Sequence, residues 1–319
     1  MITAADDCLH DSGGEVYWNE SSWFPISIPG RLTSGWVMLF HRPNMNVSVG
    51  GVALWDPSGD RPHTCLYYDW GDLFAFDASF DMFDCKLPNG LTVSLIEPLH
   101  EIELRYDSSE CHFDLRWRAT GEPFHSRWSD GAEQWGSGHF EQAGRISGTI
   151  TVHGERIDVD APSTRDRSWG PRTARKMPRA DFPWGLCEDG DGFHVFVVAD
   201  TPAATDPVAG TTENLLFGWQ RLAGDTRPLR VATRRVTERG PDGRPLRIEI
   251  RGRDDLGREL AADGECVNWL QWQGYPYTFQ WWSMVRWTFD GREAWGELQE
   301  FAPLELTRRL HRERPEVTA

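Results

Sequence analysis

The sequence lacks the features that would place it in a membrane, among disulfide-rich proteins or among zinc ribbons. No apolar run in its 319 residues approaches the roughly 18 to 20 needed to span a bilayer, and no basic stretch followed by an apolar one opens the chain. Its six cysteines lie at long irregular intervals without a C-x-x-C pair, so neither a disulfide framework nor a zinc site is indicated. We therefore expect a cytoplasmic protein with free thiols and no membrane insertion.

Positive charge and the common cofactor motifs are also scarce. The chain carries 33 Lys and Arg against 49 Asp and Glu, and a formal net charge of −16 argues against nucleic acid as a partner. It contains no G-x-x-x-x-G-K-S/T loop, no strand-coupled G-x-G-x-x-G, no G-x-S-x-G elbow and no H-E-x-x-H. Its histidines form no cluster with the spacing of a metal site. The sequence predicts chemistry without a cofactor or metal, or no chemistry.

Tryptophan, in contrast, is abundant. There are 17 Trp, more than the 16 Phe or the 6 Tyr, and hydrophobic residues make up 39% of the chain. A chain this rich in apolar residues can bury a substantial core. The composition predicts either a very aromatic core or an aromatic-lined cavity.

Alternation with a period of two predicts an all-β protein. Residues 278–289 read as one long strand, and residues 101–106 with 111–117, and 146–152 with 156–159, read as hairpins. Many short strands joined by tight turns indicate two antiparallel β-barrels or sandwiches packed in tandem. The irregular-looking stretch 161–183 predicts the boundary, with domains at 1–162 and 163–319. An unpaired strand edge leaves a homodimer possible.

Residues 164–172 combine one carboxylate, three guanidinium groups and an indole. An aspartic acid in an aromatic pocket has its pKa raised by desolvation, so Asp166 could donate a proton near neutral pH. The alternative is a structural salt bridge between Asp166 and an arginine, which would lock the two domains together.

A second candidate pair lies upstream, where His139 and Glu141 are two residues apart. On a strand they project from one face, and a carboxylate there could orient the imidazole as a proton relay. The alternative is a solvated surface pair. The next residue, Gln142, is a candidate polar anchor for a ligand.

Aromatic residues gather near the C-terminus, in 268–277 and in the strand that follows. Ring faces turned into a cavity bind flat or polyenic hydrocarbons and stabilise a passing cation. Packing in the core explains aromatic residues on strands equally well. In the next strand, Glu297 and Glu300 lie on opposite faces, so at most one would face a lumen. The candidate ligand-facing residues are Trp269, Trp272, Tyr275, Tyr277, Trp281 and Glu297.

Residues 138–142, Gly144, Gly148 and especially 165–172 resemble the tandem-lipocalin group that includes hydroxyneurosporene synthase (carotenoid hydratase) and AttH-like proteins. Fungal decalin-forming Diels-Alderases are similar in architecture. The group's Asp-x-x-Trp-Gly signature maps onto Asp166, Trp169 and Gly170, but Arg167 stands where the group often has His. The resemblance implies two lipocalin-like (calycin) barrels, no metal or nucleotide, and a hydrophobic terpenoid or polyketide ligand bound between the barrels.

These observations together favour a cofactor-independent hydratase, dehydratase, isomerase or cyclase acting on a terpenoid, steroid-like or polyketide molecule. Asp166 would be the acid, with His139 and Glu141 as relay or water-positioning groups, and Arg167 or Arg172 could hold a carbonyl or carboxylate. The aromatic wall would comprise Trp169, Trp269, Trp272 and Trp281. Two alternatives remain: a non-catalytic lipocalin-like carrier, and a pericyclase that only shapes a reactive polyene and needs no acid.

Overall fold

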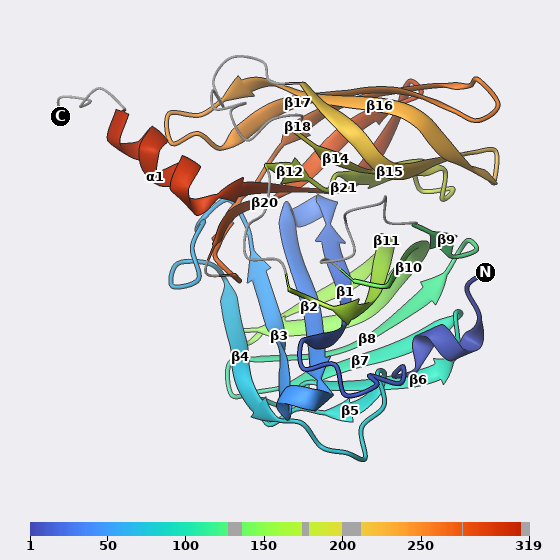
Figure 1. The fold of residues 1–319 in the computed structure, drawn as a ribbon. Helices are drawn as coiled ribbons and strands as arrows, with labels where there is room; N and C mark the ends of the chain where they lie inside the picture. Colours follow the sequence, from blue (N-terminus) through green and yellow to red (C-terminus); the bar gives the residue numbers. More distant parts are fainter. Residues whose placement is uncertain (127–135, 174–178, 200–211, 276, 314–319) are drawn as a thin grey trace.

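The structure is a computed structural model that describes residues 1–126, 136–173, 179–199, 212–275 and 277–313 (Figure 1). The first sheet contains β1 (Trp18–Ile28), β2 (Thr33–Arg42), β3 (Val47–Trp55), β4 (Tyr67–Ala75), β5 (Asp84–Lys86), β6 (Thr92–Glu97), β7 (Glu101–Asp107), β8 (Cys111–Ala119), β9 (Phe124–His125), β10 (Gly138–Val152) and β11 (Glu155–Pro171). The second contains β12 (Ala180–Asp181), β13 (Trp184–Leu186), β14 (Gly192–Val198), β15 (Thr212–Leu222), β16 (Asp225–Arg239), β17 (Pro245–Asp254), β18 (Glu259–Cys266), β19 (Leu270–Trp272), β20 (Thr278–Phe289) and β21 (Arg292–Pro303). Short 3-10 turns at Ala4–Asp7, Pro29–Arg31 and Pro43–Met45 and the helix α1 (Leu304–Glu313) complete the described elements.

The two sheets are antiparallel and lie one above the other, as Figure 1 shows. The first follows the order β4-β3-β2-β1-β11-β10-β8-β7-β6-β5 and curls into a half-barrel. In the second, β21 pairs with both β13 and β20, which closes an eight-strand barrel. The prediction of an all-β protein with tandem lipocalin-like units is confirmed.

The structure has strands where apolar and polar residues alternate most clearly in the sequence. β20 occupies the predicted range 278–289, and β7 pairs with β8 as the predicted hairpin. The hairpin between β10 and β11 turns at His153 and Gly154, both at positive φ (50° and 81°), so Val152 pairs with Glu155. Positive φ at both central residues is the geometry of a two-residue turn that matches the twist of the strands.

The prediction of irregular structure from residue 161 onward is wrong for residues 161–171. β11 continues without interruption from Glu155 to Pro171, so the first sheet runs past residue 162, where the sequence predicts the boundary. Hydrophobic alternation is hidden here because the face turned away from the second sheet carries Arg165 and Arg167, each fully buried in an ion pair. Paired charges can therefore occupy core positions that a hydrophobicity pattern assigns to a loop.

Three apolar clusters form the core. One fills the concave side of the first sheet, and another fills the closed barrel. The third lies between the two sheets and joins tryptophans from both: Trp23, Trp36, Trp55, Trp184, Trp219, Trp272 and Trp282. Much of the tryptophan content thus lies where the two units meet. Among the described residues, no helix is long and apolar enough to cross a membrane.

Candidate active site

A cavity of about 350 Å³ opens between the two sheets and takes its lining from both. Its walls are largely aromatic, and its polar groups come mainly from β1, β10, β11, β20 and β21. The lining comprises Tyr17, Asn19, Ser21, Ser22, Trp23, Met38, Phe40, Arg42, Met45, His139, Asp166, Ser168, Arg172, Phe182, Phe196, Trp272, Tyr275, Tyr277, Gln280, Trp282, Gln299 and Phe301. An apolar molecule that enters this space meets a small group of ionisable side chains.

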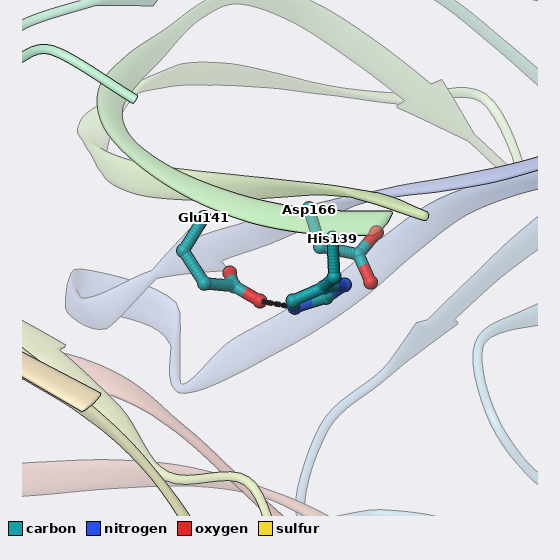
Figure 2. A group of neighbouring side chains, drawn as sticks. All are labelled: His139, Glu141 and Asp166. Atoms are coloured by element: carbon teal, nitrogen blue, oxygen red, sulfur yellow. Dashed lines mark hydrogen bonds and ion pairs between the residues drawn. The ribbon is translucent and has the colours of Figure 1, made fainter. Parts of the chain in front are cut away.

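Four polar side chains form two adjacent cross-strand pairs on the neighbouring strands β10 and β11. His139 lies opposite Ser168 and Glu141 opposite Asp166 in the strand register, so all four project from one face. His139 Nε2 is 2.5 Å from Glu141 Oε1, and His139 Nδ1 is 2.6 Å from Ser168 Oγ. Figure 2 shows the Asp166 carboxyl beside this bonded pair. The predicted common face of His139 and Glu141 is confirmed, and both are buried, which rules out the solvated surface pair.

Burial sets the protonation of this group. It raises the pKa of Asp166 to about 7, although Arg172, the Trp23 backbone, Arg167 and Arg165 each act to lower it. Burial and the facing Asp166 raise the pKa of Glu141 well above its ordinary value. Burial, with His194, Arg172 and His125 nearby, lowers the pKa of His139 well below its ordinary value.

These directions favour a protonated Glu141 and a neutral imidazole, while the pKa of about 7 divides Asp166 between its two forms near neutral pH. The Glu141 hydroxyl then donates to His139 Nε2, and His139 Nδ1–H donates to Ser168 Oγ. Glu141 Oε2 and Asp166 Oδ1 are buried without a hydrogen-bond partner among the described residues. Asp166 lines the cavity, so its free oxygen can meet a ligand, whereas the predicted catalytic residue Glu141 is not part of the lining.

The alternative of a salt bridge through Asp166 does not match the described ion pairs. Arg165 donates to both carboxylate oxygens of Asp7 at 2.7 and 3.0 Å, and Arg167 pairs with Glu20 at 2.5 Å. Within the described part of the chain, Asp166 forms no ion pair. The arginines that flank it in sequence point to the opposite face of β11 and tie the N-terminal segment to the sheet.

The same residues offer three ligand atoms to a metal ion, a grouping the sequence spacing does not reveal. One atom each of His139, Glu141 and Asp166 lies within 4.8 Å of the others. Without a cation, burial favours the protonated forms of both carboxyls, and the facing Asp166 adds to this effect for Glu141. Both imidazole nitrogens already hydrogen-bond, to Glu141 and Ser168. The arrangement fits a hydrogen-bonded proton site better than a metal centre.

A family model described as "Domain of unknown function (DUF7064)" matches residues 3–304 of the sequence. The chain belongs to the DUF7064 family. No curated protein is significantly similar to it in sequence.

Solved structures with low sequence identity share the fold of this DUF7064 chain. A protein assigned as AttH from Nitrosomonas europaea is 17% identical with a TM-score of 0.59, over 89% of this chain and 91% of its own. Kievitone hydratase from Nectria haematococca is 15% identical with a TM-score of 0.55, over 95% and 93%. CghA is 13% identical with a TM-score of 0.50, over 92% of each chain. The resemblance to AttH-like proteins is confirmed for the fold. The specific match to hydroxyneurosporene synthase, the cytoplasmic location and a homodimer stay predictions.

The DUF7064 structure places three of the predicted aromatic residues, Trp272, Tyr275 and Tyr277, in the cavity wall. Trp281 does not line the cavity, because its neighbours Gln280 and Trp282 face it and successive side chains of a strand alternate. Trp281 instead packs edge-on against Phe279. The sequence identified the correct strand and the wrong face.

Two other predicted wall residues lie elsewhere. Trp169 stacks on His10 with ring centroids 4.3 Å apart, on the face of β11 that carries Arg167. A Cβ at Gly138 would lie 2.2 Å from the Trp169 ring, so this glycine permits the close packing. Trp269 donates its indole N–H to the backbone oxygen of Pro245, away from the cavity lining.

Of the predicted polar binding residues, only Arg172 lines the cavity. The Gln142 amide donates to the backbone oxygens of Leu99 and Gly121 and accepts from Arg165, so Gln142 is structural. Arg167 is held by Glu20. Glu297 is fully buried outside the cavity lining, and burial raises its pKa well above its ordinary value.

Sequence reasoning missed much of the cavity wall, including Trp23, Phe182, Trp282 and Ser168. Trp23 lies on β1, where residues 19–28 are all buried. A strand buried on both faces shows no alternation from which its facing could be read. The hydroxyl of Ser168 could have been found from the pairing of β10 with β11, which sets it opposite His139.

Proposed function

We propose that this protein is a cofactor-independent enzyme that hydrates, dehydrates, isomerises or cyclises a hydrophobic terpenoid, steroid-like or polyketide molecule by acid catalysis. One observation carries the proposal: Asp166, with a pKa raised to about 7 and no ion-pair partner among the described residues, faces an aromatic cavity. A general acid works best when its pKa lies near the operating pH. An acid facing apolar ring surfaces suits a substrate that becomes cationic when protonated.

In the hydration direction, the Asp166 carboxyl transfers its proton to one carbon of a double bond, which leaves a carbocation on the other. Trp23 and Trp282 line this space, and a desolvated ring whose face is turned to a nearby cation stabilises it by about 2 kcal/mol. Water then adds to the cation and returns a proton to the Asp166 carboxylate. Dehydration is the reverse, and isomerisation loses a proton from a different carbon.

The bonded chain Glu141–His139–Ser168 positions the second reactant. The neutral imidazole bonds at both nitrogens, so its tautomer and ring orientation are fixed. Ser168 and His139 line the cavity with Asp166, whereas Glu141 lies behind them and bonds to His139. The Ser168 hydroxyl, which accepts from His139, can donate to a water molecule beside Asp166, so His139 and Glu141 position the water through Ser168.

The fold likeness to a named hydratase supports this reaction class without indicating a substrate. Kievitone hydratase shares the fold at 15% identity. A common scaffold shows that such a site can be built on it, whereas the reaction depends on the residues present. Here those residues are an acid, a neutral histidine and an aromatic wall.

The test is mass spectrometry of small molecules in heavy-oxygen water. Molecules extracted from the purified protein, and a panel of terpenoid and polyketide alcohols and alkenes, are incubated with the protein in the presence of EDTA. We expect a product that gains or loses one water, with heavy oxygen incorporated on hydration, or an isomer of equal mass. Bound molecules recovered unchanged would identify a carrier. Conversion abolished by EDTA and restored by a divalent metal would contradict the cofactor-independent mechanism.

A further inference from the structure

The cavity lining contains hydrogen-bond donors without acceptors. Asn19 Nδ2, Gln280 Nε2, Gln299 Nε2 and Arg172 Nε are buried and have no hydrogen-bond partner among the described residues. All four side chains line the cavity. A buried donor without an acceptor is costly, so such groups are expected to be satisfied by a ligand or water.

The orientation of two of these amides is fixed by their neighbours. The Asn19 oxygen accepts from Arg42 Nε at 3.1 Å, and the Gln280 oxygen accepts from Trp282 Nε1 at 2.7 Å. Guanidinium and indole nitrogens only donate, so each amide must present its oxygen to them and its NH₂ to the cavity. The hydrogen bonds to Arg42 and Trp282 therefore make Asn19 and Gln280 donors toward the cavity.

Two positive charges reinforce the donors. Arg42 and Arg172 both line the cavity, and neither forms an ion pair with the residues that the structure describes. Most other described arginines in this acidic chain pair with a carboxylate, as Arg165 and Arg167 do. Among the described residues, Arg172 Nη2 donates to the Ser21 hydroxyl, at 3.2 Å. Guanidinium groups that have no ion-pair partner, together with amide donors that have no acceptor, are the groups that bind an anionic oxygen.

We propose that the substrate carries a carboxylate, bound by Arg42, Arg172 and the Asn19 amide, at the end of its apolar body. This inference rests on the proposed function and names the substrate class of the same site: an amphipathic carboxylic acid. The strand geometry sets the distance between the carboxylate site and Asp166. Ser21, which Arg172 contacts, lies opposite Ser168, two residues along β11 from Asp166, or about 7 Å along a strand. The reacting carbon would lie a few bonds from the carboxylate.

The test compares two probes that differ only in their head group. Decanoate and decanol are each titrated at pH 7.5 against the neutral fluorescent probe N-phenyl-1-naphthylamine bound to the wild-type protein. A charge-assisted hydrogen bond should give decanoate an affinity about tenfold higher than that of decanol, as measured by displacement of the probe. Replacing both arginines by glutamine, in the double variant R42Q/R172Q, should remove this preference and leave the affinity for decanol within about threefold of wild type. The control R230Q alters an exposed arginine outside the cavity and should keep the preference.

The outcomes separate this inference from the proposed function. Equal affinity of the wild type for decanoate and decanol, or a preference that persists in the double variant, overturns the carboxylate site. Conversion of a neutral molecule in heavy-oxygen water would then still support the enzyme. If neither the neutral probe nor either ligand binds, the apolar cavity itself is contradicted, and both proposals fail.

Discussion

The Asp166→Asn variant should lose turnover by about two to four orders of magnitude, the usual contribution of a general acid. Asparagine has the same shape and is uncharged, like the protonated acid, but it cannot transfer a proton. Ligand affinity should stay within a few fold of wild type, because the aromatic wall is unchanged. Product formation from the substrate identified in heavy-oxygen water measures the first quantity, and quenching of tryptophan fluorescence measures the second.

A matched control lies on the same strand. Asp158 is also on β11 but is exposed, and its partner is the exposed Arg156. Asp158→Asn should leave turnover unchanged. A D166N protein that keeps most of its rate would favour a pericyclase that needs no acid, and in that case enlarging the cavity at Trp282 should slow the reaction. A D166N protein that fails to fold would assign Asp166 a structural role instead.

Removing Asp7 should destabilise the protein more than any exposed substitution. Its carboxylate accepts two hydrogen bonds from Arg165 and a third from the backbone N–H of Leu99, and both charged side chains are fully buried. Asp7→Ala leaves the Arg165 charge buried without a partner, which costs about 3 to 5 kcal/mol. Urea denaturation followed by tryptophan fluorescence should show the first transition at a clearly lower urea concentration.

The comparison for this effect is again the exposed pair of Arg156 and Asp158. Asp158→Ala should change the free energy of unfolding by about 1 kcal/mol or less, because solvent screens exposed charges. Equal midpoints for the Asp7 and Asp158 variants would show that the buried pair adds little. The N-terminal segment would then not be held on β11 as described.

The parts of the fold that follow a simple period could be predicted from the sequence. β20 and the β7–β8 hairpin formed in the expected places, because their apolar residues alternate and their turns are short. The common face of His139 and Glu141 follows from the same period. Their partners Ser168 and Asp166 lie more than 20 residues away in sequence, so only the pairing of β10 with β11 brings the four together.

The predictions from sequence failed where the buried residues are not the hydrophobic ones. β11 looks irregular because Arg165 and Arg167 occupy core positions, each neutralised by an acid from the N-terminal part of the chain. Trp281 and Trp282 are chemically equivalent neighbours, and only the register of β20 shows which one faces the cavity. Arg42 and Asn19 gave no signal in the sequence, because only the fold shows that both line the cavity.

The most direct test of the central claim is the protonation of Asp166 itself, measured by difference infrared spectroscopy of wild type against D166N. The folded-state pKa of about 7 exceeds the ordinary value for aspartic acid, so the carboxyl should hold its proton below pH 7 and lose it above. We predict a protonated-carboxyl carbonyl band at pH 6 that is absent in D166N and disappears with a midpoint near pH 7. A midpoint near 4 would mean that Asp166 is ionised at neutral pH, and the acid-catalysed mechanism would be contradicted.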